Sequence, residues 1–353
     1  MTNILVRCDG NLEIGLGHVV RCLALADELH EVHDCHISFA MRTGPLGIQM
    51  AEGKGYQVLT FQETDQSFNY REWLNECVRK VDAQAIVLDV RDGLSKAVVK
   101  ELRKNGILII TIDDPEDKRL EADLAFYPPV PQVKQIDWTG FTGKFYVGWE
   151  WVILRKAFAQ NTNIQKRKSA FSIQNSKFKL LITMGGSDPQ DMTIKAVEAL
   201  ELLDEDFEAV VVLGAGFQHK EELDNLLSNS KHHFDVRENV QNMAELMSQS
   251  DLAIASFGVT AYELAAMGVP AIYLCLTEDH AESASALVEK GMAISLGVFT
   301  HVNTEMIAAQ ISNVINNKSL LSELTTNAIK YIDGQAVAKI SRLMIERYET
   351  GNE

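Results

Sequence analysis

The first half of the chain alternates short apolar runs with longer stretches whose apolar residues recur at helical spacing. The apolar runs have the length of strands and lie at residues 4–6, 36–41, 58–61, 85–88, 107–112 and 123–126. Nearly continuous apolar strands that alternate with helices are typical of βα units and of a parallel sheet covered on both faces. The pattern therefore predicts an α/β domain in this half.

The alternation restarts after a polar stretch that has no sustained apolar period. Further strands are predicted at residues 180–184, 209–213, 252–255 and 271–275, and helices from about 220, near 282–290, and at 304–316, 320–331 and 337–348. The polar stretch is typical of an interdomain connection. At 353 residues the chain is also long for one domain. We expect an N-terminal α/β domain over 1–158, a linker over 159–177 and a C-terminal α/β domain over 178–353.

Residues 9–21 are the most distinctive stretch, because they have the order strand, glycine loop, helix. Gly15 and Gly17 allow a tight turn and a close approach of a ligand to the backbone. The helix start offers unpaired N–H groups and a positive dipole end, which together favour phosphate. The dinucleotide fingerprint needs a third glycine where Val20 stands, and no Walker-type lysine follows. The loop indicates a phosphate-bearing ligand without specifying NAD or ATP.

His18 stands where this loop meets the helix. An ordinary imidazole titrates near neutrality, so it can take a proton from water or a hydroxyl. A helix N-terminus favours the neutral, proton-accepting form. Two interpretations remain open: a catalytic base that faces the bound ligand, or a loop histidine that only binds the backbone.

Two loops in the second half have the same order of strand end, small residues and helix start. They are Gly185-Gly186-Ser187 and Ser256-Phe257-Gly258-Val259-Thr260. Both can offer N–H groups to a diphosphate, although such loops are also ordinary in doubly wound domains. Ser187 or Asp188 is expected to cap the next helix, with Pro189 in its first turn. These loops favour a nucleotide-binding role for the C-terminal domain.

Several acidic and histidine residues have both a functional and an ordinary interpretation. Glu263, one turn into its helix, is expected either to hold ribose hydroxyls or to complement the helix dipole in solvent. Asp279-His280 follows a strand and is expected either to contact substrate or to be a polar loop. Asp89 and Asp113-Asp114 also follow strands, at the edge where α/β sheets bind ligands.

Metal binding is not expected from these patterns. His30, His33, Cys35 and His36 are close in sequence but match no standard zinc spacing. Asp113-Asp114 can hold Mg²⁺ or form a turn before Pro115. No metal or other cofactor is therefore included in the expected site.

Charge and cysteine content exclude several classes of partner. The formal net charge of −16 argues against general affinity for nucleic acid or anionic membranes. Five scattered cysteines do not resemble a disulfide framework. No secretory signal pattern and no membrane-length apolar stretch is found, so we expect a cytoplasmic protein without stable membrane insertion.

One motif resembles the N-terminal signature of a known enzyme family. It consists of Arg7-x-Asp9 followed by Ile14-Gly15-x-Gly17-His18-x-x-Arg21. The family is that of the UDP-2,4-diacetamido-2,4,6-trideoxy-β-L-altropyranose hydrolases of pseudaminic acid biosynthesis, with the related spore-coat polysaccharide proteins. The resemblance continues in residues 112–114, 148–155, 184–188, 255–263 and 270–286. It departs from the family at Asp89-Val90, where Asp-His is frequent, and at Asp279-His280, where Asn-Gln is frequent.

The resemblance implies two Rossmann-like domains of the GT-B type with the ligand cleft between them. It implies hydrolysis of a nucleotide-activated, UDP-linked deoxy-amino sugar to free sugar and nucleoside diphosphate without a metal. His18 would activate water, Glu263 would hold the ribose, and Gly17, Gly186, Ser187 and Val259 would lie near the diphosphate or nucleotide. The expected binding residues are Gly15, Gly17, Arg21, Gly185, Gly186, Ser187, Ser256, Gly258, Val259, Thr260, Glu263, Asp279 and His280.

Two other functions remain open on the same scaffold. A GT-B glycosyltransferase would replace water by a hydroxyl acceptor. A non-catalytic nucleotide-sugar sensor would bind the same ligand without turnover and would not depend on His18 for its effect.

Overall fold

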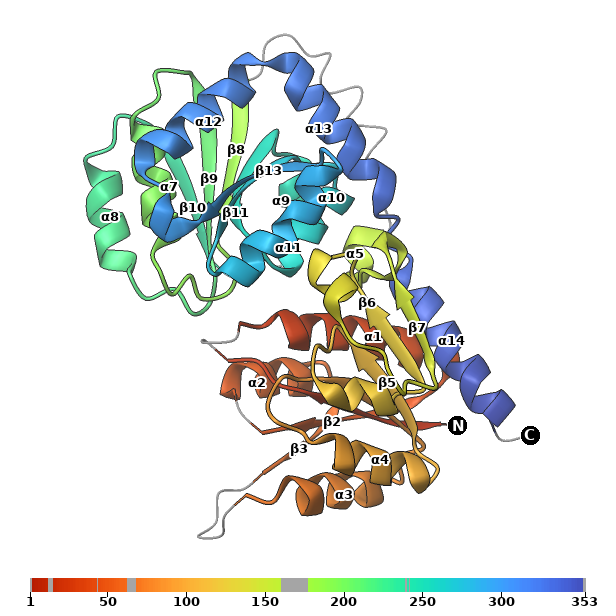
Figure 1. Cartoon of the computed structure of the whole chain (residues 1–353). Coiled ribbons are helices and arrows are strands. Elements are labelled where there is room, and N and C mark those ends of the chain that lie inside the picture. Colours follow the sequence, from red (N-terminus) through yellow and green to blue (C-terminus); the bar gives the residue numbers. More distant parts are fainter. Residues whose placement is uncertain are drawn as a thin grey trace. The chain divides into compact units, whose positions relative to one another are not determined.

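Figure 1 shows the computed structural model, which describes residues 2–11, 15–42, 44–61, 68–159, 177–238, 240 and 242–351. The chain forms two compact units. Unit 1 comprises Met1–Pro129, Val133–Arg155 and Gln335–Glu353, and unit 2 comprises Val130–Gln132 and Lys156–Gly334. Residues 160–176 of the expected linker lie outside the described residues.

Unit 1 contains a seven-stranded parallel sheet with the order β3-β2-β1-β4-β5-β6-β7. Its strands are β1 (Asn3–Cys8), β2 (His36–Met41), β3 (Gln57–Thr60), β4 (Ala85–Asp89), β5 (Leu108–Ile112), β6 (Leu124–Tyr127) and β7 (Lys144–Val147). The strand order reverses between β1 and β4. In open α/β sheets such a switch point marks the ligand crevice, at the carboxyl ends of the strands.

Helices cover both faces of this sheet (Figure 1). They are α1 (Gly17–His33), α2 (Pro45–Gly53), α3 (Tyr70–Lys80), α4 (Lys96–Lys104) and α14 (Ala336–Gly351). Apolar residues of α1, α2 and α14 share one core cluster with Ile4 and Val6, whereas α3 and α4 share another with Leu5. Successive residues of β1 thus point to opposite faces, both apolar, as the sequence pattern predicts.

The C-terminal helix differs from the sequence-based division, which assigns residues up to 353 to the C-terminal domain. Ile340 and Met344 of α14 are buried in the core that α1 shares with β1. Ser341 Oγ also lies 3.1 Å from His33 Nε2 at the end of α1. The apolar spacing of 337–348 predicts a helix but does not specify which sheet buries it, and the helix returns to unit 1.

Unit 2 contains a six-stranded parallel sheet with the order β10-β9-β8-β11-β12-β13. Its strands are β8 (Phe178–Thr183), β9 (Phe207–Leu213), β10 (Phe234–Glu238), β11 (Leu252–Ser256), β12 (Ala271–Cys275) and β13 (Ala293–Val298). The order reverses between β8 and β11. The two glycine loops singled out in the sequence therefore follow the two strands at this switch point.

The helices of unit 2 include two of the three predicted C-terminal helices, those expected at 304–316 and 320–331. They are α5 (Lys156–Ala159), α7 (Met192–Glu201), α8 (Lys220–Ser228), α9 (Met243–Ser248), α10 (Val259–Ala266), α11 (Glu278–Glu289), α12 (Thr304–Asn316) and α13 (Lys318–Tyr331). The predicted fold class of two Rossmann-like α/β domains is confirmed. None of the helices within the described ranges is long and apolar enough to cross a membrane.

Candidate active site

His18 is the second residue of α1, directly beyond the loop that follows β1. Gly15 in that loop has a φ of 77°, a left-handed conformation that glycine adopts without strain. Leu16, the residue before α1, provides no side-chain cap for the first turn of the helix. The His18 side chain is 23% exposed, so it is not sealed inside the core.

Asp89 is the last residue of β4 and lies opposite Cys8 of β1 in the sheet register. Its carboxylate is buried, with 1% exposure, and its Oδ1 atom is 2.6 Å from His18 Nδ1. The contact sits at the switch point of the sheet, where a ligand crevice is expected. The position of Asp89 at this edge is predictable from the sequence, but its pairing with His18 is not.

Arg21 binds the same carboxylate from one turn further along α1. Its Nε donates to Asp89 Oδ2 at 2.6 Å, and one terminal nitrogen donates to Oδ1 at 2.5 Å. Burial alone would raise the pKa of Asp89, but the Arg21 charge and then His18 outweigh it and hold that pKa well below its usual range. Asp89 is therefore an ionised, bidentately bound carboxylate.

Three further contacts extend this cluster. Cys22 Sγ donates to Asp89 Oδ2 at 3.4 Å. A second terminal nitrogen of Arg21 lies 3.3 Å from Asp113 Oδ2, and Arg91 contacts the same oxygen. Asp113, directly after β5, is thus bound by two arginines.

A second buried cluster holds the chain just before the His18 loop. The Arg7 guanidinium is fully buried and donates to Asp9 Oδ2 at 2.5 Å and to Asp92 Oδ2 at 2.6 Å. Asp9 Oδ1 accepts the backbone N–H of Arg42 at 2.7 Å, and Tyr70 bonds to both Arg7 and Asp92. The Arg7-x-Asp9 motif therefore fixes the end of β1 against the end of β2. Sequence reasoning used this motif only for its resemblance.

The glycine turn after β8 packs closely on the turn after β9. Gly185 has a φ of 81°. A β-carbon added at Gly214 would lie 2.4 Å from the carbonyl oxygens of both Gly185 and Gly186, and Gly216 donates its N–H to Gly186 at 2.8 Å. A β-carbon at Gly185 would in turn lie 3.6 Å from Ser256 Oγ. The two predicted loops of unit 2 therefore meet, as the neighbouring positions of β8 and β11 require.

The helix after the glycine turn begins later than the sequence predicts. Helix α7 begins at Met192, so Ser187 is not its cap and Pro189 is not in its first turn. Asp188 reaches past the turn and accepts the N–H groups of Met192 at 3.0 Å and Thr193 at 2.8 Å. Its side chain is thus used to hold α7, while Gly185 to Ser187 form the turn.

Helix α10 starts directly after Gly258, so Val259 and Thr260 form its first turn. Glu263 follows in the same helix and is only 4% exposed. This burial excludes the interpretation of Glu263 as a solvated first-turn acid. A ribose-binding role for Glu263 stays a prediction.

Asp279 and His280 lie in the first turn of α11, which begins at Glu278 and not near residue 282 as expected. Thr277 caps this helix, since its Oγ1 accepts the N–H of His280 at 3.2 Å. Asp279 Oδ1 accepts from Gln132 Nε2 at 3.1 Å. The predicted polar loop is therefore a capped helix start, in which the Thr277 side chain satisfies one of the unpaired N–H groups of the first turn. Substrate contact by either residue stays a prediction.

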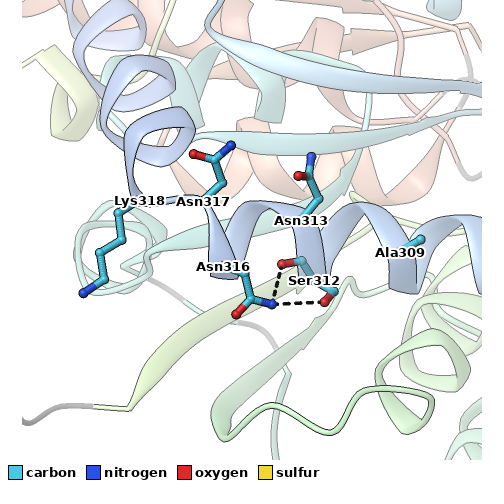
Figure 2. A pocket seen from close by; sticks show the side chains of 6 residues that line it. All are labelled: Ala309, Ser312, Asn313, Asn316, Asn317 and Lys318. Carbon is cyan, nitrogen blue, oxygen red and sulfur yellow. Dashed lines mark hydrogen bonds between the residues drawn. The ribbon is translucent and has the colours of Figure 1, made fainter.

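Two of the hollows on unit 2 lie entirely along described residues. A shallow one of about 650 Å³ lies where α12 meets α13 (Figure 2). Asn316 and Ser312 on its wall both bond to Glu205, which precedes β9 at the amino ends of the strands. The smaller hollow, about 130 Å³, lies at the carboxyl ends of β9 and β10, lined by Leu213, Gly214, Ala215, Phe217, Lys220 and Glu238. Only the smaller hollow adjoins the glycine turns.

Among the described residues, no three or more His, Cys, Asp or Glu side chains gather as metal ligands. His30 Nδ1 lies 3.1 Å from the Cys35 carbonyl oxygen, and His33 contacts Ser341. Asp114 accepts from Lys118 Nζ at 3.2 Å. These residues therefore have structural partners within unit 1.

Comparison with known proteins agrees with this architecture. The model of the glycosyltransferase family 28 C-terminal domain matches residues 180–342, which include both glycine loops. The crystal structure of Acinetobacter baumannii MurG superposes with a TM-score of 0.74 at 16% identity, covering 98% of this chain and all of that one. The fold is of the GT-B type. The predicted GT-B architecture of two Rossmann-like domains is thus confirmed.

Relatives that match most of this GT-B chain have low sequence identity. An uncharacterized protein of Methanocaldococcus jannaschii is 30% identical over 282 residues, which are 78% of this chain but only 56% of that protein. The spore coat polysaccharide biosynthesis protein SpsG of Bacillus subtilis is 23% identical over 97% of both chains. The UDP-2,4-diacetamido-2,4,6-trideoxy-β-L-altropyranose hydrolase of Campylobacter jejuni is 23% identical over 82% of this chain and 98% of that enzyme.

Proposed function

We propose that this protein hydrolyses a nucleotide-activated deoxy-amino sugar, with UDP as the nucleotide, in the biosynthesis of a bacterial surface glycan. The observation that carries the proposal is the contact of His18 Nδ1 with the buried Asp89 carboxylate at 2.6 Å. A histidine bound in this way at a ligand-binding edge is equipped to act as a base. The products are the free sugar and a nucleoside diphosphate.

The proposed reaction is a displacement at the anomeric carbon. His18 takes a proton from water as the water oxygen bonds to that carbon. The bond from the carbon to the diphosphate oxygen breaks, and its electron pair leaves with the nucleoside diphosphate. N–H groups at helix starts and glycine turns stabilise the negative charge on the leaving diphosphate.

Residues of unit 2 provide the nucleotide site in this proposal. Gly186, Ser187 and Val259 are assigned to the diphosphate and nucleotide, and Glu263 to the ribose hydroxyls. The packed turns at Gly185 and Gly214 give the loop a fixed backbone, which favours binding through N–H groups.

Relatives of nearly full length support the proposed pathway class. SpsG, by its name, takes part in spore coat polysaccharide biosynthesis, and it aligns with 97% of this chain. The Campylobacter enzyme is named as a hydrolase of a UDP-linked diacetamido sugar. Both alignments are long enough to extend into unit 1, the unit that carries His18, whereas the family 28 model matches only residues 180–342.

Glycosyl transfer is the second candidate, and the family 28 match favours it. The same base would deprotonate a hydroxyl acceptor in place of water. The two candidates differ only in which nucleophile the unit 1 site admits.

Incubation with UDP- and CDP-linked amino sugars in the absence of any acceptor separates the candidates. Hydrolysis predicts steady release of free sugar and nucleoside diphosphate by NMR, and loss of this release in His18→Ala while nucleotide binding persists. Binding without turnover in the wild type would contradict hydrolysis and would direct the search to an acceptor. A biological effect that survives His18→Ala would instead favour a non-catalytic sensor.

A further inference from the structure

We propose that Asp89 is a positioning residue that fixes the tautomer and orientation of His18, so that Nε2 is the atom that accepts the proton. The inference deepens the proposed function, since it rests on His18 as the base. Its structural part, the protonation of Nδ1, can be tested on the protein alone, in the absence of substrate.

Two groups approach the same nitrogen of His18. His18 Nδ1 lies 2.6 Å from Asp89 Oδ1 and 3.1 Å from a terminal nitrogen of Arg21. An arginine only donates, and an ionised carboxylate only accepts. Nδ1 therefore cannot satisfy both in the neutral ring.

The distances and the charge of Asp89 decide between them. A bare Nδ1 would face a carboxylate oxygen at 2.6 Å with two lone pairs opposed and no proton between them. A protonated Nδ1 donates to that oxygen at the length of a strong, charge-assisted bond. Arg21 keeps both of its own bonds to Asp89 in this arrangement. Nδ1 thus carries the proton, and Nε2 is left with its lone pair.

Arg21 also explains why Asp89 is not the base itself. Each oxygen of the carboxylate already accepts a hydrogen bond from Arg21. Cys22 donates a further hydrogen bond to Oδ2. At 1% exposure the carboxylate does not meet solvent. Asp89 therefore acts through His18, and Arg21 holds it ionised and in place.

The fold makes this arrangement stiff. His18 and Arg21 are three positions apart on α1, so they lie on one face of the helix. Both bind the end of β4, the strand beside β1. One carboxylate thus anchors the first turn of α1 on the switch point of the sheet.

Nitrogen-15 NMR of histidine-labelled protein tests the inference directly. The chain has nine histidines, and His18→Gln identifies the His18 signals by their loss. The wild type should show a protonated Nδ1 and a pyridine-type Nε2. In Asp89→Asn the amide oxygen should turn to Arg21 and the NH₂ group to His18, so that Nδ1 accepts and the proton moves to Nε2.

Asp92→Asn is the matched control. Asp92 is also a carboxylate at this sheet edge and accepts from two arginines, Arg7 at 2.6 Å and Arg42 at 3.2 Å, but it has no contact with His18 in the structure. It should leave the His18 tautomer as in the wild type. Asp89→Glu keeps the carboxylate and should retain the wild-type tautomer, which covers the case in which Asp89→Asn does not fold.

Kinetics separate this inference from the proposed function. Asp89→Asn should lower kcat about 10²- to 10⁴-fold with little change in KM, as for other histidine bases placed in the wrong tautomer. A proton on Nε2 in the wild type, or an unchanged tautomer in a folded Asp89→Asn, would overturn the inference. If the NMR spectra show the expected tautomers but no sugar tested is turned over, only the hydrolysis proposal would be overturned.

Discussion

Asp89 Oδ1 lies 2.6 Å from Nδ1 of His18, although the two residues are 71 positions apart in the chain. The contact exists because β4, which ends in Asp89, pairs with β1 and not with the strand that precedes it in sequence. The loop after β1 then brings His18 over the same edge. The pairing of β1 with β4 therefore brings the proposed base, His18, and its carboxylate partner together at one edge of the unit 1 sheet.

Replacing His18 should remove catalysis and spare nucleotide binding. His18→Ala should lower kcat about 10²- to 10⁴-fold, the usual contribution of a general base. UDP affinity, measured by calorimetry, should stay within a few-fold because the nucleotide residues are assigned to unit 2. His36→Ala is the control, since His36 is an exposed histidine at the start of β2. Equal activity of the two variants would refute the role of His18.

Replacing Arg21 should destabilise the fold. Arg21→Met leaves the Asp89 carboxylate buried with its main partner gone, and breaking such a pair costs about 3 to 5 kcal/mol. Urea unfolding should show this loss at neutral pH. Lys54→Met, which breaks the surface pair with Asp27 at 2.8 Å, should cost less than about 1 kcal/mol. Similar losses in both variants would contradict the buried-pair account.

Asp114 should give stability a pH dependence of defined sign. Burial raises its pKa from 3.8 to about 6, although Lys118 opposes the shift. Between these values the folded protein binds more protons at Asp114 than the unfolded chain, so this residue lowers stability as the pH rises from about 4 to about 6. Urea midpoints across this range should therefore fall less steeply, or rise more steeply, with pH in Asp114→Asn than in the wild type. Parallel curves for the two proteins would exclude the shift.

Gly214→Ala should disturb the turn assigned to the nucleotide. The added β-carbon would lie 2.4 Å from the carbonyl oxygens of Gly185 and Gly186, so that turn must move. We expect a loss of about 1 to 3 kcal/mol in the free energy of unfolding and weaker UDP binding by calorimetry. Gly53→Ala, where a β-carbon meets no atom within 4 Å, is the control and should leave both unchanged or slightly improve stability. Unaltered UDP binding in Gly214→Ala would contradict the assignment of this turn.

Central elements of both units are readable from the sequence because both faces of their strands are buried. The predicted helix at 304–316 coincides with α12, and the predicted run at 85–88 forms most of β4. The edge strands β7 and β10 were not predicted; each is largely exposed or half-buried, and β10 lacks an apolar run. The apolar pattern of a strand reflects how far its side chains are buried, and the side chains of β7 and β10 are buried little.

The candidate site was predictable only in part for a related reason. A glycine loop, a helix start and His18 are adjacent in sequence, so their chemistry can be recognised locally. The partner of His18 depends on strand order, and several strand-end acids, among them Asp89 and Asp113, were equally placed. The choice between them is made by the pairing of β1 with β4, which no local pattern encodes. The return of α14 to unit 1 is a similar long-range choice.

The most direct test of the central claim is the fate of oxygen from water during turnover. Reaction of the wild type with a UDP-linked deoxy-amino sugar in ¹⁸O-labelled water, without acceptor, should place the label on the anomeric hydroxyl of the released sugar and leave the UDP unlabelled. His18→Ala should release neither product at a comparable rate. Label in the UDP, or no release of sugar until an acceptor hydroxyl is added, would contradict attack of His18-activated water on the anomeric carbon.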